Sequence, residues 1–282
     1  MNGSMDAPAL TGINAPGELR AAALVCLETA DPEEKCRCTE TVYAALQSGR
    51  LAVDPRCRLE VPLRPGRPER PRLVPPARVP RRRPGSRAGR IALIHAVVHI
   101  EFNAVNLAWD AVARFPGMPE AFYRDWARVA AEEARHFRLL ARRLASLGAA
   151  YGDLPAHDGL WEMALATRDD VLERMALVPR VLEARGLDVT PGMIERLRAA
   201  GDGETAAVLE RILEEEIGHV ALGSHWFRYC CTRRGWPPRE TFRRLVRQRM
   251  RGRIKPPLHR AARRAAGFTE RELEELEAMF DA

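Results

Sequence analysis

The sequence predicts an all-α protein whose centre is a four-helix bundle. Leu, Ala, Arg and Glu dominate the 282 residues, while Tyr and Phe are sparse. Between the glycines, apolar residues recur at steps of three and four, which is the period of an amphipathic helix and not of a strand. The hydrophobic content of 46% is ordinary for a folded globular protein, so a core of normal size is expected.

Residues 1–50 are predicted to form an N-terminal helical segment. Two short helices are expected there, interrupted around Asp31 and Pro32, because this pair favours a turn. The start, MNGSMDAPALTG, lacks the apolar core of a signal peptide. No apolar run reaches the length of about 18 residues that a membrane span needs. The six cysteines show no paired C-x-x-C spacing. We therefore expect a soluble cytoplasmic protein with reduced thiols and no membrane association.

Residues 51–89 form a Pro/Arg-rich arm. Nine prolines lie between Pro55 and Pro84, with arginines between them, and such a stretch cannot hold a helix. It could be a disordered linker, an arm wrapped over the core, or a basic strip for an anionic partner. Apolar side chains that could dock on a core favour the wrapped arm: Leu59, Val61, Leu63, Leu73, Val74 and Val79.

Residues 90–232 contain the four long helical patterns of the bundle. Expected helices run over 90–115, 119–147, 161–185 and about 202–230, and the first three are stopped by Pro116, Gly148 and Gly186. Residues 233–282 then form a basic C-terminal tail that closes with an amphipathic helix, TERELEELEAMF.

An acid and an imidazole interrupt the apolar stripe of the second bundle helix. In VAAEEARHFRLL, Glu133 and His136 fall in line with the apolar positions. Glu132 does not, because its neighbours at helical spacing are Arg128 and Arg135, so it is interpreted as a surface ion-pair member. A buried charge without a partner is costly, which predicts a cation at the inward pair.

The same inward E-x-x-H recurs in the fourth helix as Glu216 and His219. Each motif is preceded by one inward acid, Glu101 in the first helix and Glu183 in the third. The intervals are nearly equal, at 32 residues (133 − 101) and 33 residues (216 − 183), so two helix pairs are related by an approximate repeat.

Four carboxylates and two imidazoles in a bundle core suit two divalent metals, because the carboxylates offset the metal charge and each imidazole supplies a neutral nitrogen. The six predicted ligands, which are also the predicted catalytic residues, are Glu101, Glu133, His136, Glu183, Glu216 and His219.

Other residues near this set have two interpretations each. Pro179, four residues before Glu183, could open a substrate pocket through a kink or serve packing alone. Asp188 could orient a ligand or cap a turn, and His95 and His99 could bond to ligands but are expected at the surface or as caps. The first helix is expected to have a solvent-exposed face (its wet side), formed by His99, Asn103, Asn106 and Asp110. Three aromatic residues beside the site could carry radicals, but core packing is the expected role: Tyr123, Trp126 and Trp226.

This ligand pattern is that of the ferritin-like di-iron carboxylate proteins. Segments such as HIEFNAVNLAWDAVARFPGMPEAFYRDW, YGDLPAHDGLWE and VLERILEEEIGHVALGSHWF resemble one bacterial branch of that superfamily, labelled a domain of unknown function. The resemblance covers nearly the whole chain from about residue 15, and it implies the same six metal ligands. It implies no substrate.

The resemblance implies a di-iron oxidoreductase, a monooxygenase or oxidase, with two iron ions and O2 as co-substrate. Manganese is the alternative metal. The chain lacks a G-x-G-x-x-G fingerprint after a strand, so an external reductase would supply electrons to a small-molecule substrate, and the protein would be a monomer or homodimer. Iron storage or oxidation and peroxide removal are a second class, and a bundle with a vestigial site is disfavoured because all six ligands are present. The net charge of +7 allows a nucleic-acid partner, including tRNA hydroxylation, without requiring one.

Overall fold

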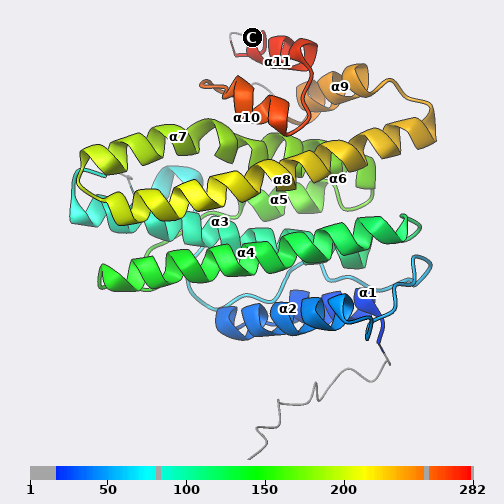
Figure 1. The fold of residues 1–282 in the computed structure, drawn as a ribbon, viewed down its shortest axis with the longest axis horizontal. Helices are drawn as coiled ribbons and strands as arrows, with labels where there is room; N and C mark the ends of the chain where they lie inside the picture. The colour runs from blue at the N-terminus through cyan, green and yellow to red at the C-terminus, as the bar shows by residue number, and fades with distance from the viewer. Residues whose placement is uncertain (1–16, 81–83, 251–253, 281–282) are drawn as a thin grey trace, which may run out of the picture.

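The computed structural model describes residues 17–80, 84–250 and 254–280. Every regular element in these residues is helical, with only two isolated β-bridges, Glu18 to Ala52 and Leu73 to Ala156. The all-α prediction is therefore confirmed. Figure 1 shows the helices stacked in layers, with α1 and α2 along one side, the long helices in the middle and α9 to α11 along the opposite side.

The N-terminal helices are α1 (Leu19–Glu28) and α2 (Pro32–Gln47). They separate at the predicted position because the Asp31 side chain accepts the Glu34 N–H as a helix cap and Pro32 takes the first helical position. The described cysteines are all free, and Cys26 Sγ lies 2.7 Å from Cys38 Sγ. The residues before 17 lie outside the described part of the chain. The expectation that the N-terminus carries no signal peptide concerns those residues.

The Pro/Arg-rich arm lies against the helices. Backbone hydrogen bonds join Gly66 N–H to the Leu27 carbonyl and Val74 N–H to the Ala156 carbonyl. The indole Nε1 of Trp161 donates to the Leu63 carbonyl. Leu59 and Val61 pack on the core, whereas the Leu63 side chain is 58% exposed. These contacts agree with the wrapped arm for the described part of this segment, which contains one short 3-10 turn, η1 (Pro76–Arg78).

The centre of the molecule is the pair α3 (Arg87–Arg114) and α4 (Glu120–Ser146). Of the described helices, only α3 is long and apolar enough to cross a membrane by length and composition, but 89% of its most apolar window is buried inside the protein. We therefore interpret α3 as the core helix of a bundle. The predicted wet side of α3 is wrong, because its members are buried: His99, Asn103, Asn106 and Asp110.

The third predicted helix, over 161–185, is wrong at both ends. The chain instead forms α5 (Gly159–Ala166), α6 (Val171–Leu177), a π-helical turn η2 (Val178–Glu183) and α7 (Ala184–Ala199). A break separates α5 from α6, where the Asp170 side chain caps the Leu172 N–H. Gly186 lies inside α7 and does not end it. α8 (Gly203–Arg234) then runs beside α7 and ends at Gly235, which has a left-handed φ of 65°.

Pro179 is accommodated by η2 and by its neighbour on α8. A π turn forms where a proline interrupts the regular hydrogen-bond ladder. A Cβ added at Gly223 would lie only 2.3 Å from the Pro179 Cβ, so the absence of a side chain at Gly223 is what allows the two helices to approach here.

The tail forms α9 (Pro238–Met250), α10 (Arg260–Ala265) and α11 (Glu270–Glu277). Two buried arginines attach it to the bundle. Arg180 in η2 contacts Glu272 at 2.7 Å, and its guanidinium lies over three phenylalanine rings: Phe227, Phe242 and Phe268. Arg263 in α10 forms a two-pronged pair with Asp188. Asp188 lies inside α7 and anchors the tail, so the predicted cap of a turn is wrong. Its other predicted role, orienting a ligand, stays a prediction.

Candidate metal centre

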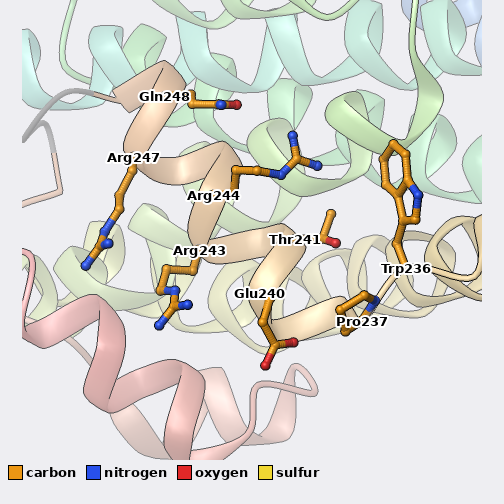
Figure 2. Close-up of a pocket in the computed structure, with 8 residues that line it drawn as sticks. All are labelled: Trp236, Pro237, Glu240, Thr241, Arg243, Arg244, Arg247 and Gln248. Carbon is orange, nitrogen blue, oxygen red and sulfur yellow. The ribbon is translucent and has the colours of Figure 1, made fainter.

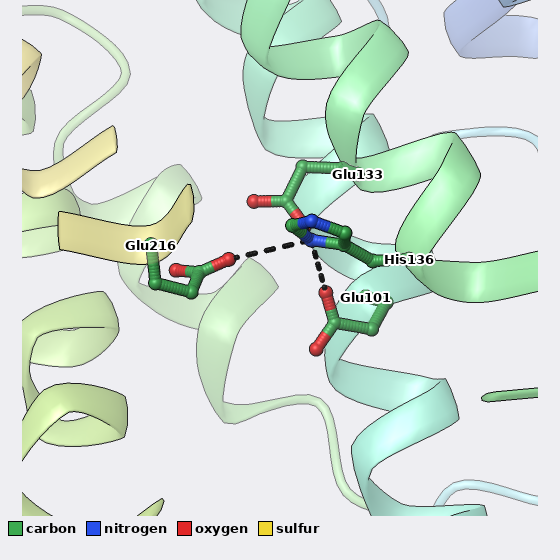
Figure 3. A group of neighbouring side chains, drawn as sticks. All are labelled: Glu101, Glu133, His136 and Glu216. Atoms are coloured by element: carbon green, nitrogen blue, oxygen red, sulfur yellow. Dashed lines mark ion pairs between the residues drawn. The ribbon is translucent and has the colours of Figure 1, made fainter. Parts of the chain in front are cut away.

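Three helices bring most of the predicted ligands together. α3 supplies Glu101, α4 supplies Glu133 and His136, and α8 supplies Glu216. Ligand atoms of these four residues all lie within 4.8 Å of one another. Figure 3 shows the four side chains pointing toward a common point from the three helices. We refer to these four residues, together with His219 and Glu183, as the Glu/His cluster.

The imidazole rings of the cluster both present Nδ1 to the carboxylates. Nδ1 of His136 lies 3.4 Å from an oxygen of Glu101 and 3.4 Å from one of Glu133. Nδ1 of His219 lies 3.0 Å from Glu133 Oε1 and 3.3 Å from Glu216 Oε1. The ring centroids of the two histidines are 5.8 Å apart, so the carboxylates lie beside both rings on their Nδ1 sides.

The other nitrogen of each ring contacts a carboxylate from the opposite motif. Nε2 of His136 lies 2.8 Å from Glu215 Oε2, and Nε2 of His219 lies 2.7 Å from Glu132 Oε2. A carboxylate that accepts the outer N–H of a histidine fixes the ring and its tautomer, and leaves the inner nitrogen free to bind a metal. We call Glu132 and Glu215 the outer carboxylates.

Sequence reasoning misjudged Glu132 and missed Glu215. The expected contact of Glu132 with Arg128 is present at 3.8 Å, but the same carboxylate also reaches His219 across the bundle. A signal was available, because both motifs read E-E-x-x-H: EEARH and EEIGH. The first Glu of each motif orients the histidine of the other, so the internal repeat extends one residue further than the ligand set.

Four polar atoms of the cluster are buried without a hydrogen-bond partner in the described part of the chain. They are Oε2 of Glu133, Oε2 of Glu183, Nδ1 of His136 and Nδ1 of His219. Native interiors satisfy most buried polar atoms. Two carboxylate oxygens and two imidazole nitrogens are donor atoms that a divalent metal takes. The side chains present therefore fit a bound metal.

Burial and mutual repulsion perturb the carboxylates. Burial, followed by the charges of Glu216 and Glu133, raises the pKa of Glu183 to about 8. Burial and the Glu133 charge raise the pKa of Glu101 well above its usual value. Burial alone would lower the pKa of His136, but the carboxylates around it raise that pKa far above its usual value. The site favours positive charge, as a metal would supply.

Glu183 is the last residue of η2 and lies outside the set of four residues whose ligand atoms are all within 4.8 Å of one another. Its side chain is partly buried, with Oε2 fully covered, and its pKa responds to Glu216, Glu133 and His219, so it belongs to the same neighbourhood. The π turn before it is therefore the local feature that sets where this carboxylate enters the bundle.

A cavity of about 470 Å³ adjoins the cluster. All four cluster glutamates line it, whereas neither cluster histidine does. Most of its other described lining residues are aliphatic, from α3, α5, α7 and α8. The cavity thus borders the carboxylate side of the cluster. The predicted pocket near Pro179 agrees with this position, because Leu182 and Glu183 of η2 form part of its wall.

The remaining candidate residues have structural contacts. His99 is buried beside the cavity, with Nδ1 2.9 Å from the Tyr151 hydroxyl. His95 accepts N–H groups of the 150–154 loop. The surface or capping role expected for these two histidines is wrong, because that loop covers α3.

The three aromatic residues expected to pack in the core do so. Tyr123, Trp126 and Trp226 are buried, and the rings of all three lie within 6.3 Å of Phe122. The Tyr123 hydroxyl donates to the Phe115 carbonyl, and the Trp226 indole donates to Asp125.

A second hollow lies on α9, away from the cluster residues. Figure 2 shows Arg243, Arg244 and Arg247 along this helix, with Trp236 at its start. The guanidiniums of Arg234 and Arg244 lie 5.2 and 5.5 Å from the Trp236 ring centroid, and Arg243 lies 3.5 Å from Glu275. We call these α9 residues with Trp236 the arginine groove.

Comparison with known proteins places the chain in a family. Residues 28–274 match the family model described as "Protein of unknown function (DUF455)". The chain belongs to DUF455. An "Uncharacterized protein" from Haemophilus influenzae (strain ATCC 51907 / DSM 11121 / KW20 / Rd) is 43% identical over 259 residues, covering 88% of this chain and 90% of that protein. No solved structure matches. This DUF455 chain therefore carries the Glu/His cluster within a family whose name assigns no activity.

Proposed function

We propose that this DUF455 protein is a ferritin-like, non-haem di-iron oxidoreductase that activates O2 to hydroxylate or oxidise a small molecule. The observation that carries the proposal is a set of four buried atoms without a hydrogen bond, on Glu133, Glu183, His136 and His219, at the edge of an apolar cavity. A buried polar atom without a hydrogen bond costs about 1–3 kcal/mol, and bound metals would offset that cost at all four atoms.

The charge balance supports two divalent ions. Four carboxylates and two neutral imidazoles carry four negative charges, which two divalent cations neutralise. The symmetry of the motifs supports the same number, since each half of the repeat supplies two glutamates and one histidine. Iron is proposed first and manganese second, because carboxylate and imidazole ligands suit both.

Bound metals would supply the redox chemistry and the O2 binding, and the protein side chains have separate tasks. Glu132 and Glu215 accept hydrogen bonds from the outer nitrogens (Nε2) of the two histidines, so that both Nδ1 atoms face the cluster carboxylates. The aliphatic cavity walls exclude water from the reacting side. Hydroxylation of R–H consumes O2, two electrons and two protons, and yields R–OH and water. The electrons would come from an external reductase. We propose that the DUF455 protein that receives them is cytoplasmic and is a monomer or a homodimer.

Metal handling is the main alternative. Iron oxidation and peroxide removal need room only for small inorganic molecules, and a cavity of about 470 Å³ with aliphatic walls exceeds that need. This favours an organic substrate. Nucleic-acid modification is the second alternative, and the arginine groove is the observation that favours it, because clustered guanidiniums attract phosphates.

The test is anaerobic reconstitution with ferrous iron, followed by exposure to O2 or to peroxide. The proposal expects O2 consumption and a change in the visible spectrum, without vigorous release of O2 from peroxide. Rapid catalase activity would favour the peroxide-removing alternative. A protein that takes up no metal would refute both.

A further inference from the structure

The walls of the cavity are formed by short aliphatic side chains that face one another. α3 contributes Val97 and Ala104, α8 contributes Ile212 and Leu213, and α7 contributes Val189. Small-molecule sites of about 300–1,000 Å³ with apolar walls and few polar groups are typical of proteins. The volume of about 470 Å³ lies in this range.

The described lining residues include no Phe, Tyr or Trp. Enzymes that act on a nucleobase hold it by stacking between aromatic or apolar faces and by hydrogen bonds to its edge. The ring of His99 is one of only two imidazoles outside the cluster that line the described cavity, and its nitrogens contact Tyr151, Asn103 and the His157 carbonyl. Among the described lining residues, a base would therefore find aliphatic faces but no Phe, Tyr or Trp ring to stack on.

Among the described lining residues, no cation is available for a phosphate or carboxylate. Arg185 is the guanidinium that lines the described cavity. Its N–H groups donate to three carbonyls of the tail, those of Lys255, Pro256 and Pro257. Arg185 therefore fastens the tail beside the cavity, and these carbonyls occupy the N–H groups that an anion would need.

Three methionines from three elements complete the wall: Met163 of α5, Met193 of α7 and Met250 of α9. Methionine side chains are flexible and adapt to irregular apolar shapes. This part of the wall suits aliphatic chains of varied outline, which a rigid aromatic wall would not.

From these observations we infer that the cavity binds a small, uncharged aliphatic molecule that lies along the walls of α3 and α8, with one carbon beside the cluster glutamates. This inference rests on the proposed function and names its substrate class. On this inference the reacting molecule is not a nucleobase. A nucleic acid bound in the arginine groove would therefore not be the substrate of the Glu/His cluster.

The test measures binding of hexanol, octanol and decanol to the purified full-length protein by isothermal titration calorimetry, with metal content determined on the same sample. Binding should be saturable at one site, and each added methylene should strengthen it about fourfold, the equivalent of ~0.8 kcal/mol. Adenosine should neither bind nor displace decanol.

A matched pair of variants locates the site. Leu213→Trp places an indole in the cavity wall, whereas Leu222→Trp makes the same change on the same helix, at a partly buried residue outside the cavity lining. Decanol affinity should fall about tenfold or more in Leu213→Trp, which corresponds to ~1.4 kcal/mol, and stay unchanged in Leu222→Trp. Both variants should keep the metal content of the parent protein.

Three results would overturn the inference: affinity that does not rise with chain length, equal losses in the two variants, or displacement of decanol by adenosine. Failure of the proposed function is a different result. If decanol binds with the expected chain-length and variant dependence but the protein takes up no metal, the di-iron proposal is refuted and the cavity assignment holds.

Discussion

Removing the charge of an outer carboxylate should weaken metal binding without removing a ligand. Glu132→Gln and Glu215→Gln keep the side-chain size but convert into neutral amides the carboxylates whose oxygens lie 2.7 Å from His219 Nε2 and 2.8 Å from His136 Nε2. Loss of such a partner typically costs 10–100-fold in metal affinity. We therefore expect each variant to lose about 1.4–2.8 kcal/mol of metal binding free energy.

The assay is a competition titration of Co2+ or Mn2+ against a chelator, with Glu214→Gln as the control. Glu214 is the exposed neighbour of Glu215 on α8, so it reports the general effect of removing one negative charge near the site. The reasoning fails if Glu214→Gln loses as much affinity as Glu215→Gln, or if neither outer-carboxylate variant changes the affinity at all.

Two further predictions concern the contacts of η2, the turn that carries Glu183. Gly223→Ala should destabilise the fold by about 1–3 kcal/mol, because its Cβ would lie 2.3 Å from the Pro179 Cβ. Gly218→Ala on the same helix has open space and should be neutral or stabilising by up to ~1 kcal/mol; urea unfolding compares the two, and equal effects would contradict the packing argument. Arg180→Met should cost about 3–5 kcal/mol, because it leaves Glu272 buried without its partner. Adding Glu272→Gln to that variant should restore part of the loss, and a double variant as unstable as the single one would show that this ion pair is not the cause.

Local patterns predicted the elements whose ends have chemical markers. Asp31 and Pro32 separate α1 from α2, and Pro116 and Gly148 follow the ends of α3 and α4. The predicted end of the third bundle helix was wrong because we expected Gly186 to terminate it. A glycine inside a helix costs only about 1 kcal/mol, which the packing of the helix can offset. The π turn at Pro179 gave no periodic signal at all.

The errors around the site have one cause: segments distant in the sequence pack over residues that looked solvent-exposed in their own helix. His99 and Asp110 looked like the wet side of α3, but the 150–154 loop and Arg174 of α6 cover them. Glu132 has the local partner that the sequence indicated, and the contact with His219 across the bundle adds a second role. Helical spacing within one segment carries no information about which segment lies opposite.

The inward positions of the Glu/His cluster were predictable because they need only the helical period and a repeated motif. Glu101, Glu133, His136 and Glu216 lie together as their spacing indicated, and His219 contacts Glu133. Their role as metal ligands remains a prediction. So does the identity of the metal, because carboxylate and imidazole donors suit more than one divalent ion.

The most direct test of the account is the metal stoichiometry of the anaerobically reconstituted protein, measured alongside Glu133→Ala and His219→Ala. The account predicts two iron ions per chain in the parent protein and loss of stoichiometric binding in both variants, with the fold retained by circular dichroism. A parent protein without bound metal, or either variant holding two ions as firmly as the parent, would contradict it.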